Sequence, residues 1–237
     1  MLGRLLEISV DCGEVLESLE FWRGLGFSLL PTSDTWKHRY GVASDGHLYL
    51  GLHDFRFPSP SLTFVTPRLR ETVEQLEQEG IHFEFAKLSP DEFNEAGFFD
   101  PTGQIVTLLE ARTFSPPSPG ETGQSLLGHF RAVRRRSTAP ADARDFWGRL
   151  GALEYGEDEI AGDGFNLQFR PDSAAVELVF ESPTPADRAG RLVQAGFRIR
   201  PEGEDQILEA PDGLRVRMVP EESTAGPETL PELESED

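Results

Sequence analysis

The feature that most constrains this chain is an internal repeat. Three short segments occur twice, in the same order, and the sequence offset between the two copies of a segment shortens toward the C-terminus. Residues 21–27 (FWRGLGF) correspond to 146–152 (FWGRLGA), residues 75–81 (QLEQEGI) to 191–197 (RLVQAGF), and residues 100–103 (DPTG) to 210–213 (APDG). Because three collinear matches are much stronger evidence than one, the sequence predicts two structurally equivalent halves.

Each half shows the same series of periodic segments. Near the start of the chain, Leu6, Ile8 and Val10 alternate with polar residues, the pattern of a strand with one buried face. Val15 and Trp22 then fall at helical spacing, before two glycines that end the run. The first half is expected to continue with strands over 47–53 and 61–65, a second helix over 68–79, a turn at 100–103 and a last strand over 104–110. The second half repeats this order.

The composition also marks boundaries between the segments of the chain. A run of Ser, Pro and Gly (SPPSPG) separates the two copies of the repeat, and such runs are typical of linkers. The end of the chain is rich in Glu and Pro and has few large apolar residues. We therefore expect a first module over 1–112, a linker over 113–126, a second module over 127–219 and an acidic tail over 220–237.

The net charge of −20 limits the partners that the chain can have. Such a surface repels phosphate backbones and anionic lipids, so neither nucleic acid nor a membrane is an expected partner. Glu7 interrupts the N-terminus before a signal-peptide core can form, and the single cysteine, Cys12, cannot make an internal disulfide. We therefore expect a cytoplasmic protein.

The repeated segments resemble a known family. A first strand, a helix ending in FWRGLGF, a later helix ending in Gly80 and a DPTG turn before a final strand are similar to the vicinal oxygen chelate superfamily, the glyoxalase, bleomycin-resistance and extradiol dioxygenase group. The resemblance covers nearly the whole chain up to Pro220. It implies an α+β fold in which two βαβββ modules form an incomplete eight-stranded mixed β-barrel, with the ligand on its concave face.

The resemblance also implies positions on the first, middle and last strands of each module where metal enzymes of the family carry His, Glu or Gln. In the first module these positions fall on Glu7, Gly51 and Thr107. In the second they fall on Gln168, on Arg217, and on either His129 or Ala132, depending on the loop length allowed. Glycine offers no ligand and arginine repels a cation, so no complete metal site is expected. If a metal binds, Glu7, His129 and Gln168 would hold it.

Two further residues are expected on the ligand face. Tyr49 and His53 lie on the strand face opposite Leu48, Leu50 and Leu52, so they would point into the cup. The expected ligand-binding residues are Glu7, Tyr49, His53, Thr107, Gln168 and Arg217. A purely structural alternative is a salt bridge between Glu7 and Arg217 across the barrel.

Two functions are compatible with these residues. The first is the binding of a small molecule of unknown identity without a cofactor or a complete metal site. The alternative is a divalent-metal-dependent lyase, isomerase or dioxygenase that acts on a substrate with vicinal oxygens. The sequence does not decide whether the protein is an enzyme. It also leaves open whether the modules pair within a monomer or exchange in a homodimer.

Overall fold

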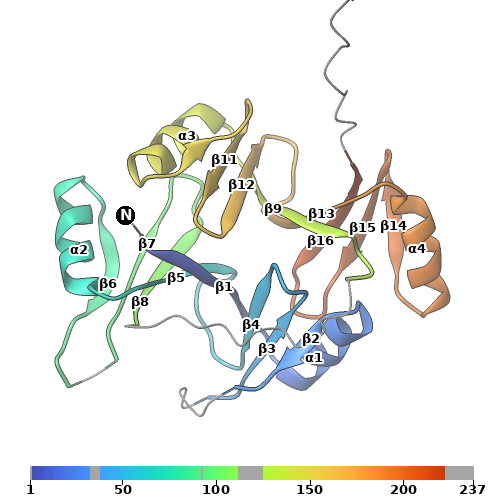
Figure 1. Ribbon diagram of the computed structural model, residues 1–237, viewed down its shortest axis with the longest axis horizontal. Helices are drawn as coiled ribbons and strands as arrows, with labels where there is room; N and C mark the ends of the chain where they lie inside the picture. Colours follow the sequence, from blue (N-terminus) through green and yellow to red (C-terminus); the bar gives the residue numbers. More distant parts are fainter. Residues whose placement is uncertain (1, 33–37, 92, 112–124, 222–237) are drawn as a thin grey trace, which may run out of the picture.

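The computed structural model describes residues 2–32, 38–91, 93–111 and 125–221. Residues 113–124 of the expected linker and 222–237 of the expected tail lie outside this range. The described chain forms two eight-stranded sheets, one from each half (Figure 1). The predicted α+β architecture of tandem halves is confirmed, but each half holds two βαβββ units, so the described residues form four units where the repeat predicts two.

The first half contains the first and second units. The first unit comprises β1 (Arg4–Asp11), α1 (Val15–Gly24), β2 (Ser28–Leu30), β3 (Tyr40–Ser44) and β4 (Tyr49–His53). The second comprises β5 (Ser61–Thr66), α2 (Leu69–Gln78), β6 (Phe83–Lys87), β7 (Glu95–Phe99) and β8 (Ile105–Glu110). The predicted strands and helices of this half are therefore present, and β2, β3, β6 and β7 join them.

The second half contains the third and fourth units. The third comprises β9 (His129–Arg136), α3 (Pro140–Arg149), β10 (Leu153–Glu154), β11 (Glu159–Gly162) and β12 (Phe165–Arg170). The fourth comprises β13 (Val176–Ser182), α4 (Pro185–Gln194), β14 (Ile199–Glu202), β15 (Asp205–Glu209) and β16 (Arg215–Pro220). None of the four described helices combines the length and the apolar character that a membrane span requires.

Both sheets have the same topology. The first has the order β2-β3-β4-β1-β5-β8-β7-β6, and the second has the order β10-β11-β12-β9-β13-β16-β15-β14. The first strands of two units meet at the centre, where β1 runs antiparallel to β5 and β9 antiparallel to β13. The sheets do not close into barrels, because each ends in two edge strands.

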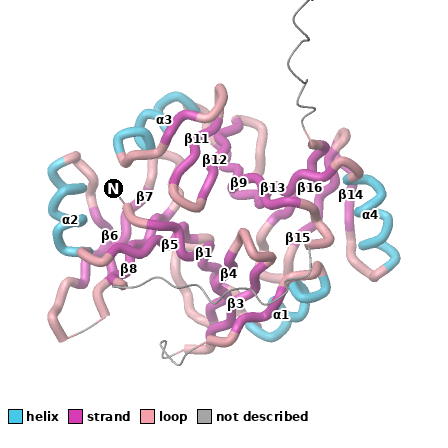
Figure 2. Tube along the Cα trace, in the orientation of Figure 1, coloured by secondary structure: helices cyan, strands magenta, loops and turns pink. Residues whose placement is uncertain are grey.

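The helices lie at the outside of the molecule, and the strands lie between them (Figure 2). Each helix covers the strands of its own unit with an apolar face; α1, for example, buries Val15 and Trp22. Ile8 and Val10 of β1 belong to the same core as Trp22. Because side chains alternate along a strand, Glu7 and Ser9 point to the opposite, polar face of the sheet.

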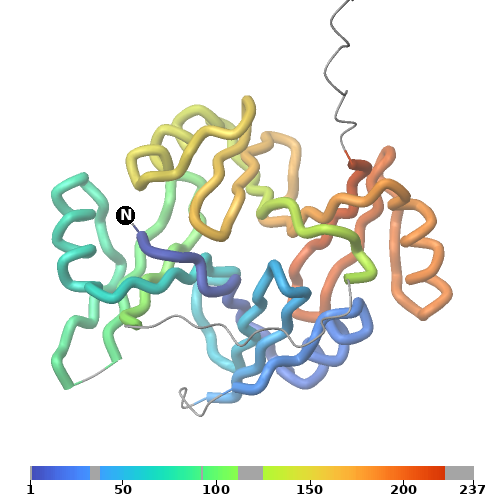
Figure 3. Tube along the Cα trace, viewed as in Figure 1, coloured from blue at the N-terminus to red at the C-terminus, as the bar shows by residue number. Residues whose placement is uncertain are grey.

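The core continues across the two halves. Phe64 of β5 contacts the rings of Trp147 and Phe165, and Phe27 contacts Phe180. In Figure 3 the blue first unit lies beside the orange and red fourth unit, and the green second unit lies beside the yellow third. The indole of Trp22 accordingly donates a hydrogen bond to Asp212. The halves therefore share one apolar interior instead of folding around separate cores.

Candidate functional site

The polar face of the first sheet is organised around Glu7. Its side chain is buried, with only 4% of the residue exposed, and its carboxylate accepts three hydrogen bonds within the protein. Tyr40 donates its hydroxyl at 2.6 Å, Ser9 donates at 2.8 Å, and the Nε2 atom of His53 lies 3.3 Å away. A buried carboxylate needs such partners, because desolvating an unpaired charge is costly. We call Glu7, Ser9, Tyr40, His53 and Thr63 the first polar cluster.

Gly51 makes the position of the Glu7 carboxylate possible. Gly51 lies on β4 opposite Ser9, at the middle-strand position of the first module. A Cβ atom added there would overlap the carboxylate of Glu7. The absence of a side chain at this position therefore allows Glu7 to lie across the sheet toward His53.

His53 connects the cluster to the surface of the molecule. Its Nδ1 atom lies 3.0 Å from Nε2 of His38, a half-buried residue that stacks against the exposed ring of Phe55. Phe57 contacts His53 edge to face. Burial and the neighbouring His53 lower the pKa of His38, which favours neutral imidazole in this chain of hydrogen bonds.

Hydroxyl groups occupy the neighbouring positions of this face. Ser9 and Thr63 are 2.7 Å apart, and Ser61 and Thr107 are 2.8 Å apart. Burial, followed by the charge of Glu7, raises the pKa of Tyr40, so its hydroxyl stays protonated and acts as a donor. The face is thus a row of neutral hydroxyls around one carboxylate.

The structure brings together some of the residues predicted from the sequence and separates others. Glu7 and His53 are in contact, and Thr107 lies on the same sheet beside Ser61. Tyr49 is half-buried at the start of β4, on the strand face of Gly51 and His53. Gln168 and Arg217 lie on the second sheet, so the six expected residues do not form one site.

Arg217 and Gln168 have partners of their own on the second sheet. Arg217 binds both oxygens of Glu177, at 2.9 and 3.0 Å, so the salt bridge with Glu7 that the sequence allowed is not formed. Gln168 accepts a hydrogen bond from Arg134 and donates one to Glu159. Charged groups therefore fill the polar face of the second sheet.

The strand register decides between His129 and Ala132. Glu7 follows a bulge in β1, and Ala132 follows the corresponding bulge in β9, where the pairing shifts between Phe130 and Ala132. Ala132 therefore occupies the position equivalent to Glu7. His129 is exposed at the first residue of β9, opposite Glu181.

The residues at the family's ligand positions do not fit a divalent metal. Glu7 lies on the first sheet, whereas His129 and Gln168 lie on the second. Both ring nitrogens of His53 are engaged, one by Glu7 and one by His38, so neither offers its lone pair to an ion in this arrangement. Within the described residues no group of three His, Cys, Asp or Glu side chains is placed to hold a metal.

Several residues of the cluster were not expected from the sequence. Ser9 and Thr63 could have been found, because they share the alternation that places Glu7 on the polar face. Tyr40 and His38 carry no such signal, since His38 lies in the connection from β2 to β3 and Tyr40 begins β3, and both reach their partners only through tertiary packing. The same holds for Glu177, the partner of Arg217.

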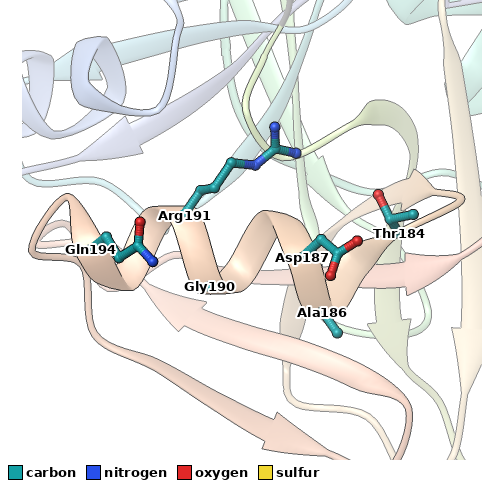
Figure 4. A pocket seen from close by; sticks show the side chains of 6 residues that line it. All are labelled: Thr184, Ala186, Asp187, Gly190, Arg191 and Gln194. Carbon is teal, nitrogen blue, oxygen red and sulfur yellow. The ribbon is translucent and has the colours of Figure 1, made fainter.

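A surface depression also lies along α4 (Figure 4). It is lined by Thr184, Ala186, Asp187, Gly190, Arg191 and Gln194. It is open to solvent and lies on a helix that covers the second sheet, whereas the first polar cluster is on the first sheet. All six lining residues are exposed, so we assign the depression no function.

Comparison with known proteins gives matches at the level of structure. No protein-family model and no curated protein matches the sequence. A catechol 2,3-dioxygenase is 15% identical, with 92% of this chain and 88% of that chain covered and a TM-score of 0.58.

Two homoprotocatechuate 2,3-dioxygenases are also similar to this chain. A variant of the Brevibacterium fuscum protein is 13% identical, with 92% of this chain and 71% of that chain covered and a TM-score of 0.63. The Arthrobacter globiformis protein is 11% identical, with 92% of this chain and 80% of that chain covered and a TM-score of 0.60. Identities this low establish the fold alone. The chain therefore has the fold of the vicinal oxygen chelate superfamily, to which these dioxygenases belong, in two tandem eight-stranded halves.

Proposed function

We propose that the protein binds a small aromatic molecule bearing hydroxyl groups at the polar face of the first sheet, without a complete metal site. The observation that carries this proposal is the buried Glu7 carboxylate, joined through His53 to the half-buried His38. Buried polar networks next to aromatic side chains are typical of small-molecule sites. Glu7, His53, Thr107 and Tyr49 are the proposed binding residues.

Aromatic side chains support the class of ligand. His38, Phe55 and Phe57 surround the outer end of the hydrogen-bonded chain, with His38 and Phe55 stacked at 5.1 Å between centroids. A planar ring would stack on these groups while its hydroxyls replace the contacts of Glu7 with Ser9 and Tyr40. The compounds named in the structural neighbours, catechol and homoprotocatechuate, have this chemistry and serve as probes.

The metal-dependent alternative is favoured by the fold of the neighbours, which are dioxygenases. Two observations argue against this alternative. Both ring nitrogens of His53 are already hydrogen-bonded, and in the second sheet the position of Glu7 is occupied by Ala132, which has no ligand atom. The two proposals differ in one measurable way, because the alternative requires binding that depends on an added divalent ion.

Isothermal titration with catechol and homoprotocatechuate tests the proposal, using protein treated with chelator and protein incubated with Fe(II), Mn(II), Ni(II) or Zn(II). We expect metal-independent binding that Glu7→Gln weakens about tenfold, because one charge-assisted hydrogen bond is lost. Glu74→Gln, on the exposed face of α2, is the matched control and leaves the affinity unchanged.

Two results would count against the proposal. One bound metal ion per chain, measured by elemental analysis and lost in Glu7→Gln, would support the metal-dependent alternative. Absence of binding by both probes under every condition would reject a catechol-like ligand at this face.

A further inference from the structure

The polar faces of the two sheets differ in charge at equivalent positions. Ser9 and Ser61 pair at the centre of the first sheet, and Arg134 and Glu177 pair at the corresponding place in the second. Likewise Val179 and Arg217 correspond to Thr63 and Thr107. In the second sheet the small hydroxyls are thus largely replaced by long charged side chains.

Three arginines surround one buried carboxylate on this face. Glu177 is fully buried and contacts Nε of Arg217 at 2.9 Å and Nε of Arg215 at 2.7 Å, while Nη1 of Arg134 lies 4.0 Å away. We call Arg134, Arg215 and Arg217 the arginine cluster. The side chains of these arginines are at most 18% exposed.

Glu177 alone does not balance the arginine cluster. Three guanidinium charges face a single carboxylate, and burial together with Arg217 lowers the pKa of Arg134. The Nε–H of Arg215 is buried and, despite its short contact with Glu177, makes no hydrogen bond of proper geometry in the described structure. Two positive charges therefore remain to be neutralised by groups outside the sheet's centre.

The tip of the β14–β15 hairpin supplies the two missing negative charges. Asp205 lies 2.6 Å from Nη1 of Arg217, and Glu202 lies 2.6 Å from Nη2 of the same residue and 2.5 Å from Nη2 of Arg215. Unlike Glu177, these carboxylates are 23% and 47% exposed. They sit at the turn next to the edge strand β14, so they can rotate into solvent without breaking the sheet.

We propose that the arginine cluster is a second binding site, specific for a short dicarboxylate, and that Glu202 and Asp205 close it by occupying the places of the ligand's carboxylates. Two carboxylates already bind separate nitrogens of the Arg217 guanidinium, which is the arrangement that one diacid would reproduce. A monocarboxylate replaces only one of them and leaves the other closing contact intact. This site is independent of the one proposed on the first sheet.

The test is a titration with malonate and succinate, with acetate as the monocarboxylate, at constant ionic strength. Binding is followed by calorimetry in the wild type and in Glu202→Gln/Asp205→Asn. Because the closing carboxylates no longer compete, we expect the double variant to bind the diacids at least about tenfold more tightly than the wild type. Acetate should bind the double variant much more weakly than the diacids, because one carboxylate fills only one of the two vacated places.

Glu204→Gln is the matched control, because Glu204 is an exposed acid in the same turn. The substitution removes one negative charge without opening the arginine cluster. It should bind the diacids as the wild type does. If the folded double variant, checked by circular dichroism, binds diacids no better than acetate, the proposal is overturned and the cluster is structural. Should the double variant not fold, Glu202→Gln replaces it, and an unchanged affinity there overturns the proposal equally.

Discussion

The indole Nε1–H of Trp147 donates a hydrogen bond to the carboxylate of Asp100 at 3.0 Å, across the boundary between the two halves. The contact of Trp22 with Asp212, at 3.1 Å, is its counterpart. Trp147 belongs to the repeated FW segment, and Asp100 begins the repeated turn before the last strand. The two repeated motifs therefore bind each other reciprocally, which ties the halves together.

Trp147→Phe is expected to lower the free energy of unfolding by about 2–4 kcal/mol, because a buried carboxylate loses a donor and the core loses volume. Urea denaturation measures the change. Leu16→Ala, at a residue 71% exposed, is the control and should change stability by less than about 0.5 kcal/mol. Equal stability of Trp147→Phe and wild type would show that the contact does not contribute.

Asp212 should make stability depend on pH. Burial raises the pKa of its carboxyl group, and hydrogen bonds from Leu214 and Trp22 only partly oppose this. The folded state therefore binds the proton more tightly, so this group stabilises the fold at low pH and the contribution is lost as pH rises through the folded pKa.

Asp212→Asn removes this dependence. The stability of the wild type relative to the variant is expected to fall from about pH 3 to about pH 7. Denaturation curves at several pH values measure it. A relative stability that rises over the same range would contradict the assignment.

Gly51→Ala is expected to displace the Glu7 carboxylate, because the new Cβ atom would overlap it. Loss of its contacts with Tyr40, Ser9 and His53 should cost about 1–3 kcal/mol of stability and weaken binding of the catechol probes. Gly13→Ala is the control, since a Cβ atom there meets nothing within 4 Å. If the two variants behave alike, Gly51 does not position Glu7.

Arg217→Met should leave the fully buried Glu177 short of its main partner and cost about 3–5 kcal/mol. Glu202→Gln removes a half-exposed partner of the same arginine and should cost less than about 1 kcal/mol. Urea denaturation at low and high salt compares them. A small effect of Arg217→Met would mean that Arg134 and Arg215 suffice to compensate Glu177.

Cys12 is expected to be unreactive in the folded protein. Burial raises the pKa of its thiol to about 11, so very little thiolate forms near neutral pH. Ellman's reagent should react with one thiol per chain in concentrated guanidinium chloride and with none under native conditions. Rapid reaction of the native protein would show that Cys12 becomes exposed by local opening.

The sequence determined the tandem architecture. The repeat of FW segments and DPTG-type turns predicted two equivalent halves, and alternation placed Glu7 and His53 on the polar side of their strands. Alternation and helical spacing are local properties, so they can be read from neighbouring residues. Short strands such as β2 and β10 leave too little periodicity to detect, which is why the four-unit composition was not foreseen.

Only the tertiary structure decided which side chains meet. Gln168 and Arg217, which the sequence grouped with Glu7, lie on a different sheet, and Arg217 pairs with Glu177 instead. Likewise, Tyr40 reaches Glu7 through the pairing of β3 with β4, and His38, which precedes β3, reaches His53. The physical reason is that a side chain's face follows from its own strand, whereas its partners follow from sheet order and register.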